Sequence, residues 1–537
     1  MTSSSQNNAS SSPHIHSGTM SSWLFAVFMA ISAVFVAQTQ NSEKAIWLPK
    51  QDLPKFGSTE DESFFDKRKL QKIYKRTTAT TTTTLLKGPE TPIIDPITGI
   101  LYVLTEDANL VSLTDFQEDP NLSEKCKIDQ NCLSAKATLV ADLGAGRPLG
   151  GAFAVTKGVG EGEDDSDNDS ARSSIYIADT LLGLIRVSNI NDAKEDKNVK
   201  PKVEIIKSSF IDAQGNTHYI RYANDVDVGP KTGHVYFTDS SSIPPERITK
   251  IETNADANTN ASTNPVTGEN VNVNSEYVTW DTMSAFKRDL IRGEASGRLL
   301  RYKPETDSID VLLDGLWFAN GVAVNAEETH VNVVETSMAR VLRYSLEREN
   351  DDALARTRTQ QDGTLDKTGK YYVKRNEYNN PEASFELVVD EFPGFPDGAT
   401  CSRVTPDITK NISPNKATAM NRLCFVAIPS PQPPLVRILH HDSMPEWLSY
   451  LLRTLLLRLP SSVLRAIKPV KYGGVAVVHT GIPPVGRGVM RLLQDVNGED
   501  MGMVTGVAVD NNNNDNRNKL FMGSLTNDFV AVYDLEE

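Results

Sequence analysis

A pattern of apolar and polar positions, the repeated phrase, recurs along this chain. A strand headed by Asn or Asp is followed by a turn and by a second strand that ends in an acidic residue and a hydroxyl residue. The phrase is clearest at 224–240 and 320–336, and weaker copies lie at 101–106, 175–180, 397–427 and 520–525. Because apolar runs bounded by turn residues are typical of strands, we expect each copy to form β-structure.

Repetition of a short β unit predicts a repeat architecture, because one unit cannot bury its apolar face alone. The spacing of the units exceeds the roughly 40–50 residues of an ordinary propeller blade, and polar insertions explain the excess. We predict an all-β fold, a six-bladed β-propeller over residues 87–537, interrupted at 253–275, 346–380 and 511–514. The units begin near Glu90, Arg147, Asn224, Asn320, Asp397 and Thr505.

A helix-like insertion stands apart from the strands at 446–459. It has a wide apolar face, carries Arg453 and Arg458, and ends before Pro460. Two placements are open: a helix packed on the propeller face, or an amphipathic lid or membrane-contacting helix beside the mouth of a site.

The residues before the strand pattern divide into three parts. Residues 1–22 are rich in Ser and Asn and are predicted to be disordered. Residues 23–37 form an apolar run that predicts a signal-anchor or a cleaved signal peptide. Residues 38–86 are predicted to form a polar stalk that ends in a threonine tract, Thr80 to Thr84. We expect entry into the secretory pathway, as a secreted protein or as a single-pass membrane protein with a luminal or extracellular propeller.

Charge and cysteine content narrow the class of protein further. A net charge of −15 argues against a nucleic-acid partner, which requires a basic surface. Cys126 and Cys132 bracket a short loop and could pair in an oxidising lumen, while Cys401 and Cys424 either pair or are buried on neighbouring strands. Glycosylation sequons lie in predicted loops at Asn121, Asn168, Asn260 and Asn411.

Four residues share one position, at the head of the innermost strand of a unit: Glu90, Asn224, Asn320 and Asp397. In a propeller such strand ends converge on the central axis. Two carboxylates and two amide oxygens form a hard site that suits Ca²⁺ better than zinc, copper or magnesium. The alternative is that these side chains only cap turns. We predict a calcium site, in which the ion polarises a carbonyl or phosphoryl oxygen or only holds the blades together.

The catalytic base stays unknown at this level. Asp225 and Asp239 are candidates by position, although either could be a strand-end carboxylate bonded to backbone. His234 falls in a turn and carries no separate catalytic signal. The sequence has no G-x-S-x-G nucleophile elbow and no Walker A loop.

Several phrases in fixed order resemble the strictosidine synthase-like family, and most of all its adipocyte plasma membrane-associated protein branch. They lie within roughly residues 85–535 and read GRPLG (146–150), YIAD (176–179), ANDVD (223–227), GRLLRY (297–302), FANGV (318–322), PGFPD (393–397) and KPVKYG (468–473). The resemblance implies a six-bladed propeller related to the paraoxonases, a Cys126–Cys132 disulfide, and the four calcium-ligand positions named above.

One difference from the family distinguishes a synthase from a hydrolase. The resemblance implies a catalytic Glu in the last blade of authentic strictosidine synthases, and the matching residue here is Thr505. A threonine cannot serve as an acid–base group at neutral pH. The leading hypothesis is therefore a calcium-dependent arylesterase- or lactonase-like hydrolase of a small-molecule substrate. The alternatives are a Pictet–Spengler-type synthase and a noncatalytic binding propeller with structural calcium.

Overall fold

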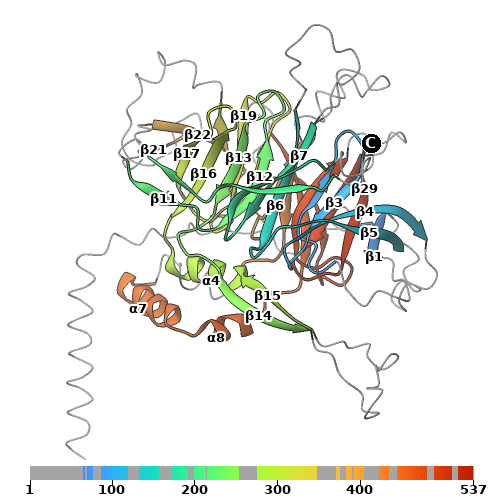
Figure 1. Ribbon diagram of the computed structural model, residues 1–537. Coiled ribbons are helices and arrows are strands. Elements are labelled where there is room, and N and C mark those ends of the chain that lie inside the picture. Colours follow the sequence, from blue (N-terminus) through green and yellow to red (C-terminus); the bar gives the residue numbers. More distant parts are fainter. Residues whose placement is uncertain are drawn as a thin grey trace, which may run out of the picture.

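The computed structural model describes residues 65–66, 69–75, 86–118, 132–156, 172–190, 199–212, 215–252, 275–346, 370–374, 382–389, 392, 394–403, 423–433, 439, 444–480, 489–510 and 518–535. These residues are mostly in β-sheets, with a small helical cap at one end (Figure 1). The arrangement is consistent with the predicted propeller.

Three sheets of four antiparallel strands follow the same plan. The first consists of β6 (Pro148–Thr156), β7 (Arg172–Asp179), β8 (Gly183–Ser188) and β9 (Lys202–Lys207). The second consists of β12 (Ala223–Val228), β13 (Val235–Asp239), β16 (Gly297–Lys303) and β17 (Ser308–Leu316). The third consists of β23 (Ala399–Cys401), β24 (Leu423–Ile428), β25 (Gly473–His479) and β26 (Val489–Asp495).

Two larger sheets complete the main body. One is ordered β18 (Ala319–Val324), β19 (His330–Glu335), β20 (Arg340–Ser345), β22 (Glu382–Val389) and β21 (Lys370–Lys374). The other has eight strands, ordered β2 (Pro92–Ile94), β3 (Leu101–Leu104), β4 (Asn109–Glu118), β5 (Cys132–Asp142), β1 (Leu70–Lys75), β29 (Phe529–Leu535), β28 (Asn518–Ser524) and β27 (Val504–Asp510). It joins the two ends of the described chain.

Strand β1 makes that junction. It pairs antiparallel with the C-terminal strand β29 and parallel with β5. Leu70 and Ile73 on this strand are almost fully buried. Residues 70–75 lie inside the range predicted as a stalk, so this part of the predicted stalk is a strand of the sheet. The rest of the predicted stalk, including Thr80 to Thr84, lies outside the described residues.

The inner strands meet around one axis. In the described part of the chain, β2, β6, β12, β18, β23 and β27 each contact the next in this order, and β27 returns to β2. Clusters of buried apolar side chains fill the spaces between successive sheets. Apolar residues on both faces of each sheet, rather than one central core, therefore hold the body together.

The cap consists of a hairpin, β14 (Glu246–Glu252) and β15 (Ser275–Asp281), and of helices α4 (Thr282–Arg292), α7 (Glu446–Leu457) and α8 (Ser461–Ala466). Figure 1 shows them together at one end of the main body. A separate small hairpin joins β10 (Ser209–Ile211) and β11 (Thr217–Tyr219). The predicted helix at 446–459 is confirmed as α7, and it is followed by α8, which the sequence analysis did not separate from it.

Helix α4 was missed in the sequence analysis. Its sequence is polar on average, but Met283, Phe286, Leu290 and Ile291 recur at helical spacing and form an apolar stripe. Its ends carry further signals: the Asp281 side chain accepts a hydrogen bond from the Ser284 N–H, and Gly293 closes the helix in the left-handed conformation at φ 65°. The short apolar stripe and the caps together were the signals that could have found it.

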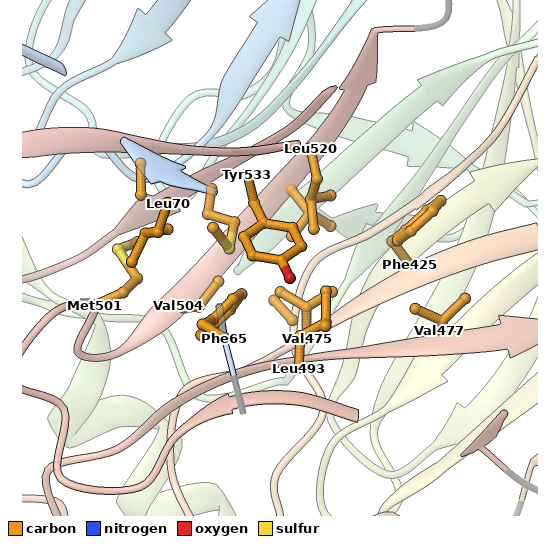
Figure 2. Packing of buried hydrophobic residues seen from close by; sticks show 14 of the residues in the cluster. Phe65, Leu70, Phe425, Val475, Val477, Leu493, Met501, Val504, Leu520 and Tyr533 are labelled. Carbon is orange, nitrogen blue, oxygen red and sulfur yellow. The ribbon is translucent and has the colours of Figure 1, made fainter. Parts of the chain in front are cut away.

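One of the clusters between sheets packs β24, β25 and β26 against β27, β28, β29 and β1 (Figure 2). Its members include Leu493, Tyr533 and Phe65, and the rings of Phe65 and Tyr533 meet edge to face at 5.4 Å. Leu493 has no exposed surface. The cluster ties the last two groups of strands to residues at the N-terminal end of the described chain.

Leu493→Ala is expected to destabilise the fold by about 2–5 kcal/mol, because it leaves a cavity in this cluster. Thermal and denaturant unfolding of the purified variant measure the loss. Leu139→Ala is the matched control, since Leu139 lies on β5 with 49% of its surface exposed. Equal midpoints for the two variants would show that the cluster does not support the fold.

Candidate metal centre

The four predicted ligands lie together where the inner strands begin. Asn224 is in β12 and Asn320 is in β18, while Glu90 and Asp397 stand just before β2 and β23. All four line the same two cavities. The structure therefore brings together at one hub residues that are far apart in the sequence.

Close packing of the inner strands creates this hub. The N–H of Gly321 donates to the Asp397 carbonyl at 3.1 Å, and the N–H of Gly398 donates to the Thr505 carbonyl at 2.9 Å. A Cβ atom at either glycine would clash with the backbone of the next inner strand. Glycine directly after the Asn or Asp of the phrase thus lets successive inner strands approach each other.

The hydroxyl residue of the phrase orients the Asn amides. Asn320 Nδ2 donates to Thr336 Oγ1 at 3.0 Å, and that hydroxyl donates to the Pro396 carbonyl at 2.7 Å. Asn224 Nδ2 makes the same bond to Ser240 Oγ at 2.9 Å. Because these hydroxyl protons are used on the neighbouring strand, the amide nitrogen faces the hydroxyl and the amide oxygen faces away from it.

Three buried oxygens at the hub make no hydrogen bond within the described residues: Glu90 Oε2, which lies 3.5 Å from Arg147, Asn320 Oδ1 and Thr505 Oγ1. Buried acceptors are normally satisfied, so a group of such oxygens at one point is a place where water or a cation can bind. Oxygen atoms from a carboxylate, an amide and a hydroxyl suit a hard cation. The donor set therefore fits Ca²⁺.

Two carboxyl groups dominate the electrostatics of the hub. Burial raises the pKa of Asp397 to about 7. Burial also raises the pKa of Glu90 well above its ordinary value, with the Arg147 guanidinium opposing the rise and the Asp397 charge adding to it. A cation placed between two buried carboxylates offsets the repulsion between their negative charges.

The ring of strand heads contains a further charged residue that the sequence analysis did not assign to the site. Arg147, just before β6, lies 3.5 Å from Glu90 Oε2 and 2.8 Å from Glu106 Oε1. Its place in the GRPLG phrase, at the same position as the Asn and Asp residues, was the available signal. The guanidinium offsets part of the negative charge that a cation would meet at Glu90.

Within the described residues there is no group of three or more His, Cys, Asp or Glu side chains with a metal-binding arrangement. The predicted set contains only two such side chains, with Asn oxygens as the remaining donors. A cation held by this set would have only oxygen donors and few carboxylates, unlike the ion of a zinc site.

The candidate bases occupy other positions. Asp239 is bound to Arg298, and its Oδ1 accepts the Tyr222 N–H at 2.8 Å. Asp239 is therefore a strand-end carboxylate bonded to backbone, which was the alternative to a role as catalytic base. Asp225 lines only one of the two cavities and accepts the N–H groups of Val226 and Val322 at 2.9 and 3.0 Å.

His234 lies away from the hub, where its Nε2 is 2.9 Å from Glu305 Oε1. That contact is at the surface, between the start of β13 and the turn after β16. The geometry gives His234 no part in the site.

The two cavities, each of about 190 Å³, lie on opposite sides of the hub. One follows the inner strands and is bordered by Asp225, Asp227 and Arg403. The other opens toward the cap and is mainly apolar, and Phe286 of α4 is part of its lining. The Phe286 ring packs edge to face on Phe318 at 4.8 Å and on a second aromatic ring, Phe395, at 5.4 Å.

The cysteine and modification predictions have mixed outcomes. Cys401 and Cys424 form a disulfide, so pairing is the correct alternative for them. Cys132 is also disulfide-bonded, but Cys126 lies outside the described residues, and their pairing stays a prediction. The sequons also lie outside the described residues: Asn121, Asn168, Asn260 and Asn411.

The N-terminal segments at 1–22 and 23–37 lie outside the described residues as well. In the part of the chain that the structure describes, no helix has the length and apolar character needed to cross a bilayer.

Comparison with known proteins agrees with the sequence phrases. The model of the strictosidine synthase family matches residues 267–349, which include Asn320. The resemblance to the strictosidine synthase-like family is confirmed. Protein STRICTOSIDINE SYNTHASE-LIKE 2 of Arabidopsis thaliana is 26% identical over 252 residues, which is 47% of this chain and 42% of that protein.

Two further relatives extend the comparison. Protein STRICTOSIDINE SYNTHASE-LIKE 10 of Arabidopsis thaliana is 23% identical over 83% of this chain and 85% of its own length. The adipocyte plasma membrane-associated protein of Salmo salar is 26% identical over 32% of this chain and 29% of its own length. A solved putative gluconolactonase covers 91% of this chain and 99% of its own, at 11% identity and a TM-score of 0.39.

Calcium affinity is expected to rise with pH as Asp397 loses its proton near pH 7. Asp397 must lose its proton before it binds a cation, so affinity changes by about tenfold per pH unit for each proton released. Isothermal titration between about pH 5 and about pH 8 measures the slope. Asp397→Asn removes this carboxyl and flattens its part of the slope; an unchanged slope in the variant would contradict the assignment.

The calcium-free protein should show the opposite trend in stability. The pKa of Asp397 is raised from 3.8 to about 7 in the fold, so the folded state holds more protons than the unfolded state between these values. The contribution of Asp397 to stability is therefore fully present below the lower value and is lost as pH rises through the higher one. Added calcium reverses this loss, which thermal unfolding with and without chelator detects.

Proposed function

We propose that this chain is a six-bladed, strictosidine synthase-like propeller that hydrolyses esters or lactones with Ca²⁺ held by Glu90, Asn224, Asn320 and Asp397. The closed cycle of inner strands supports the blade count. The observation that carries the proposal is the set of unpaired buried oxygens at a hub bordered by an apolar cavity. A bound calcium ion would polarise the carbonyl oxygen of a substrate and stabilise its developing negative charge.

The chain's own residues prepare this site before any ligand arrives. Ser240 and Thr336 fix the amides of Asn224 and Asn320 through the hydrogen bonds described above. Their oxygens therefore need little reorganisation on binding a cation, which is the electrostatic advantage of a preorganised site. The Arg147 guanidinium, 3.5 Å from Glu90 Oε2, holds Glu90 in place by charge attraction.

The apolar cavity indicates what kind of substrate would reach the hub. Phe286, Phe318 and Tyr222 form an aromatic wall, in which the Tyr222 hydroxyl is occupied by a hydrogen bond to the Thr282 carbonyl at 3.0 Å. Such a wall excludes water and accepts an aryl or alkyl group. The ester or lactone carbonyl is the polar end and would meet the hub.

The proposed reaction is a hydrolysis. Water oxygen forms a bond to the carbonyl carbon, the ester C–O bond breaks, and one proton passes from the water to the departing alcohol oxygen. The products are a carboxylic acid and an alcohol, or one hydroxy acid from a lactone. The catalytic base stays unassigned, because Asp239 is occupied and Asp225 borders the other cavity.

A synthase of the Pictet–Spengler type is the second candidate, since several relatives carry strictosidine synthase-like names. That chemistry requires a group that moves protons near neutral pH. Thr505 stands at the hub in the position that the family resemblance gives to a catalytic Glu, and its hydroxyl cannot take that role. The hydrolase is therefore preferred.

The proposed setting is the secretory pathway. Disulfides persist in oxidising compartments, and Cys401–Cys424 is such a bond. The apolar run at 23–37 supports anchoring or secretion. Similarity to adipocyte plasma membrane-associated proteins supports the same setting.

Turnover of an aryl acetate and of an aromatic lactone, with and without calcium chelator, tests the function. We expect hydrolysis that chelation abolishes and that calcium restores. Hydrolysis that survives chelation would contradict the calcium role. No hydrolysis of any ester, together with a thermal midpoint that falls on chelation, would favour the noncatalytic propeller with structural calcium. Condensation of an amine with an aldehyde would favour the synthase.

A further inference from the structure

Exposed apolar side chains are concentrated on one part of the cap. Trp447 and Leu455 of α7 and Val463 of α8 are exposed, as are Ile467 and Val470 in the segment that follows α8. Trp447 has 61% of its surface exposed, which is unusual for so large a ring. A contiguous set of such residues on a soluble surface marks a binding face.

Basic residues accompany these apolar ones. Arg458, Arg465, Lys468 and Lys471 are all exposed within the same stretch. From Trp447 to Gln494 the sequence has no Asp or Glu, although the whole chain carries a net charge of −15. Residues 447–494, which follow Glu446 at the start of α7, therefore carry only basic charges.

Acidic groups on the neighbouring elements do not reverse this charge. Asp281 at the start of α4 is paired with Arg465 at 3.3 Å. Glu294 after α4 is paired with Arg292 at 3.0 Å. Glu246 of β14 is 3.9 Å from Arg288. Each of these carboxylates faces a basic group, so Arg458, Lys468 and Lys471 still give the surface a positive charge.

The helices of the cap are fixed to one another by polar contacts. Arg288 of α4 donates to the carbonyls of Leu457 and Leu459 at 2.8 and 3.1 Å, at the C-terminal end of α7. Lys287 donates to the carbonyls of Leu464 and Ile467 at 2.9 and 2.6 Å, at the end of α8. Cations at helix C-termini stabilise the helices. The exposed apolar face is thus presented by a rigid element.

We propose that the α7–α8 surface docks on an anionic lipid bilayer, with Trp447, Leu455 and Val463 in the interface and the basic residues on the headgroups. Apolar side chains beside Lys and Arg are the composition of interfacial helices. The lining of the apolar cavity includes Leu464, Ile467 and Val470, so docking sets its mouth beside the membrane. This docking does not rest on the hydrolase activity or on calcium.

Fluorescence of a membrane-sensitive dye on the full-length chain tests the docking. The dye is attached to Val463→Cys, or to Ile205→Cys as the matched control, since Ile205 is 56% exposed on β9, away from the cap. Vesicles contain phosphatidylcholine alone or with phosphatidylserine. We expect a blue shift and quenching by lipid-borne quenchers at position 463 only, and only with the anionic lipid.

A charge variant makes the test specific. Lys468→Gln with Lys471→Gln should weaken the vesicle-dependent signal about 25-fold, at about fivefold for each basic residue lost. Any N-terminal anchor is the same in every variant, so it cannot produce these differences. No spectral change at 463, an equal change at 205, or a change that depends on protein concentration without vesicles would overturn the proposal. The last of these outcomes would indicate a second copy of the chain.

Discussion

Asp397→Asn is expected to lower calcium-dependent ester hydrolysis by about 100-fold or more. The substitution keeps the size of the side chain and removes one of the two carboxylates of the hub. Since Glu90 and Asp397 supply the negative charge of the proposed site, the variant binds calcium more weakly. Initial rates measured against buffered free calcium separate weaker calcium binding from a lower maximal rate.

The matched control is Asp314→Asn. Asp314 lies on β17, accepts the Gly315 N–H at 2.7 Å, and borders neither hub cavity. The Asp314→Asn variant should hydrolyse esters at the rate of the parent protein at all calcium concentrations. If Asp397→Asn hydrolyses esters as fast as the Asp314 control at limiting calcium, Asp397 is not a ligand.

Removal of β1 is expected to have the second largest effect. A chain that begins at residue 76 lacks Leu70, Ile73 and Phe65, and each lost buried side chain costs about 2–5 kcal/mol. It also leaves β29 and β5 without the strand that joins them. We expect a large drop in the thermal midpoint and loss of a single cooperative transition.

A chain that begins at residue 65 is the control for this truncation. It keeps β1 and its pairing with Tyr533 and the other residues of β29. Differential scanning calorimetry of the two chains measures the difference. Equal midpoints would mean that the sheet closes without β1, and that the ring does not depend on the junction of its two ends.

The strands of the repeated phrase could be predicted because their signal is local. The apolar runs of β13 and β19 are bounded by turn residues, and both strands form where the phrase places them. The hub followed from the same signal, because equivalent strand heads converge when units close around an axis. Asn224 and Asn320 thus lie at the positions that the repeat pattern predicts.

The remaining features depend on contacts between distant residues. The pairing of Leu70 with Tyr533 joins the two ends of the described chain, and no local pattern in 70–75 names that partner. The contact of Arg147 with Glu90 depends on the packing of β6 beside β2. Helix α4 carried a short apolar stripe and capping signals, but its low average hydrophobicity made it resemble a polar insertion.

Calcium titration of the metal-stripped chain by calorimetry tests the central claim most directly. We predict one calcium ion per chain for the parent protein. The Asn224→Ala and Asn320→Ala double variant keeps both carboxylates and should lose most of this binding. No heat of binding in the parent, or one ion bound with unchanged affinity in the double variant, would contradict a calcium site at the hub.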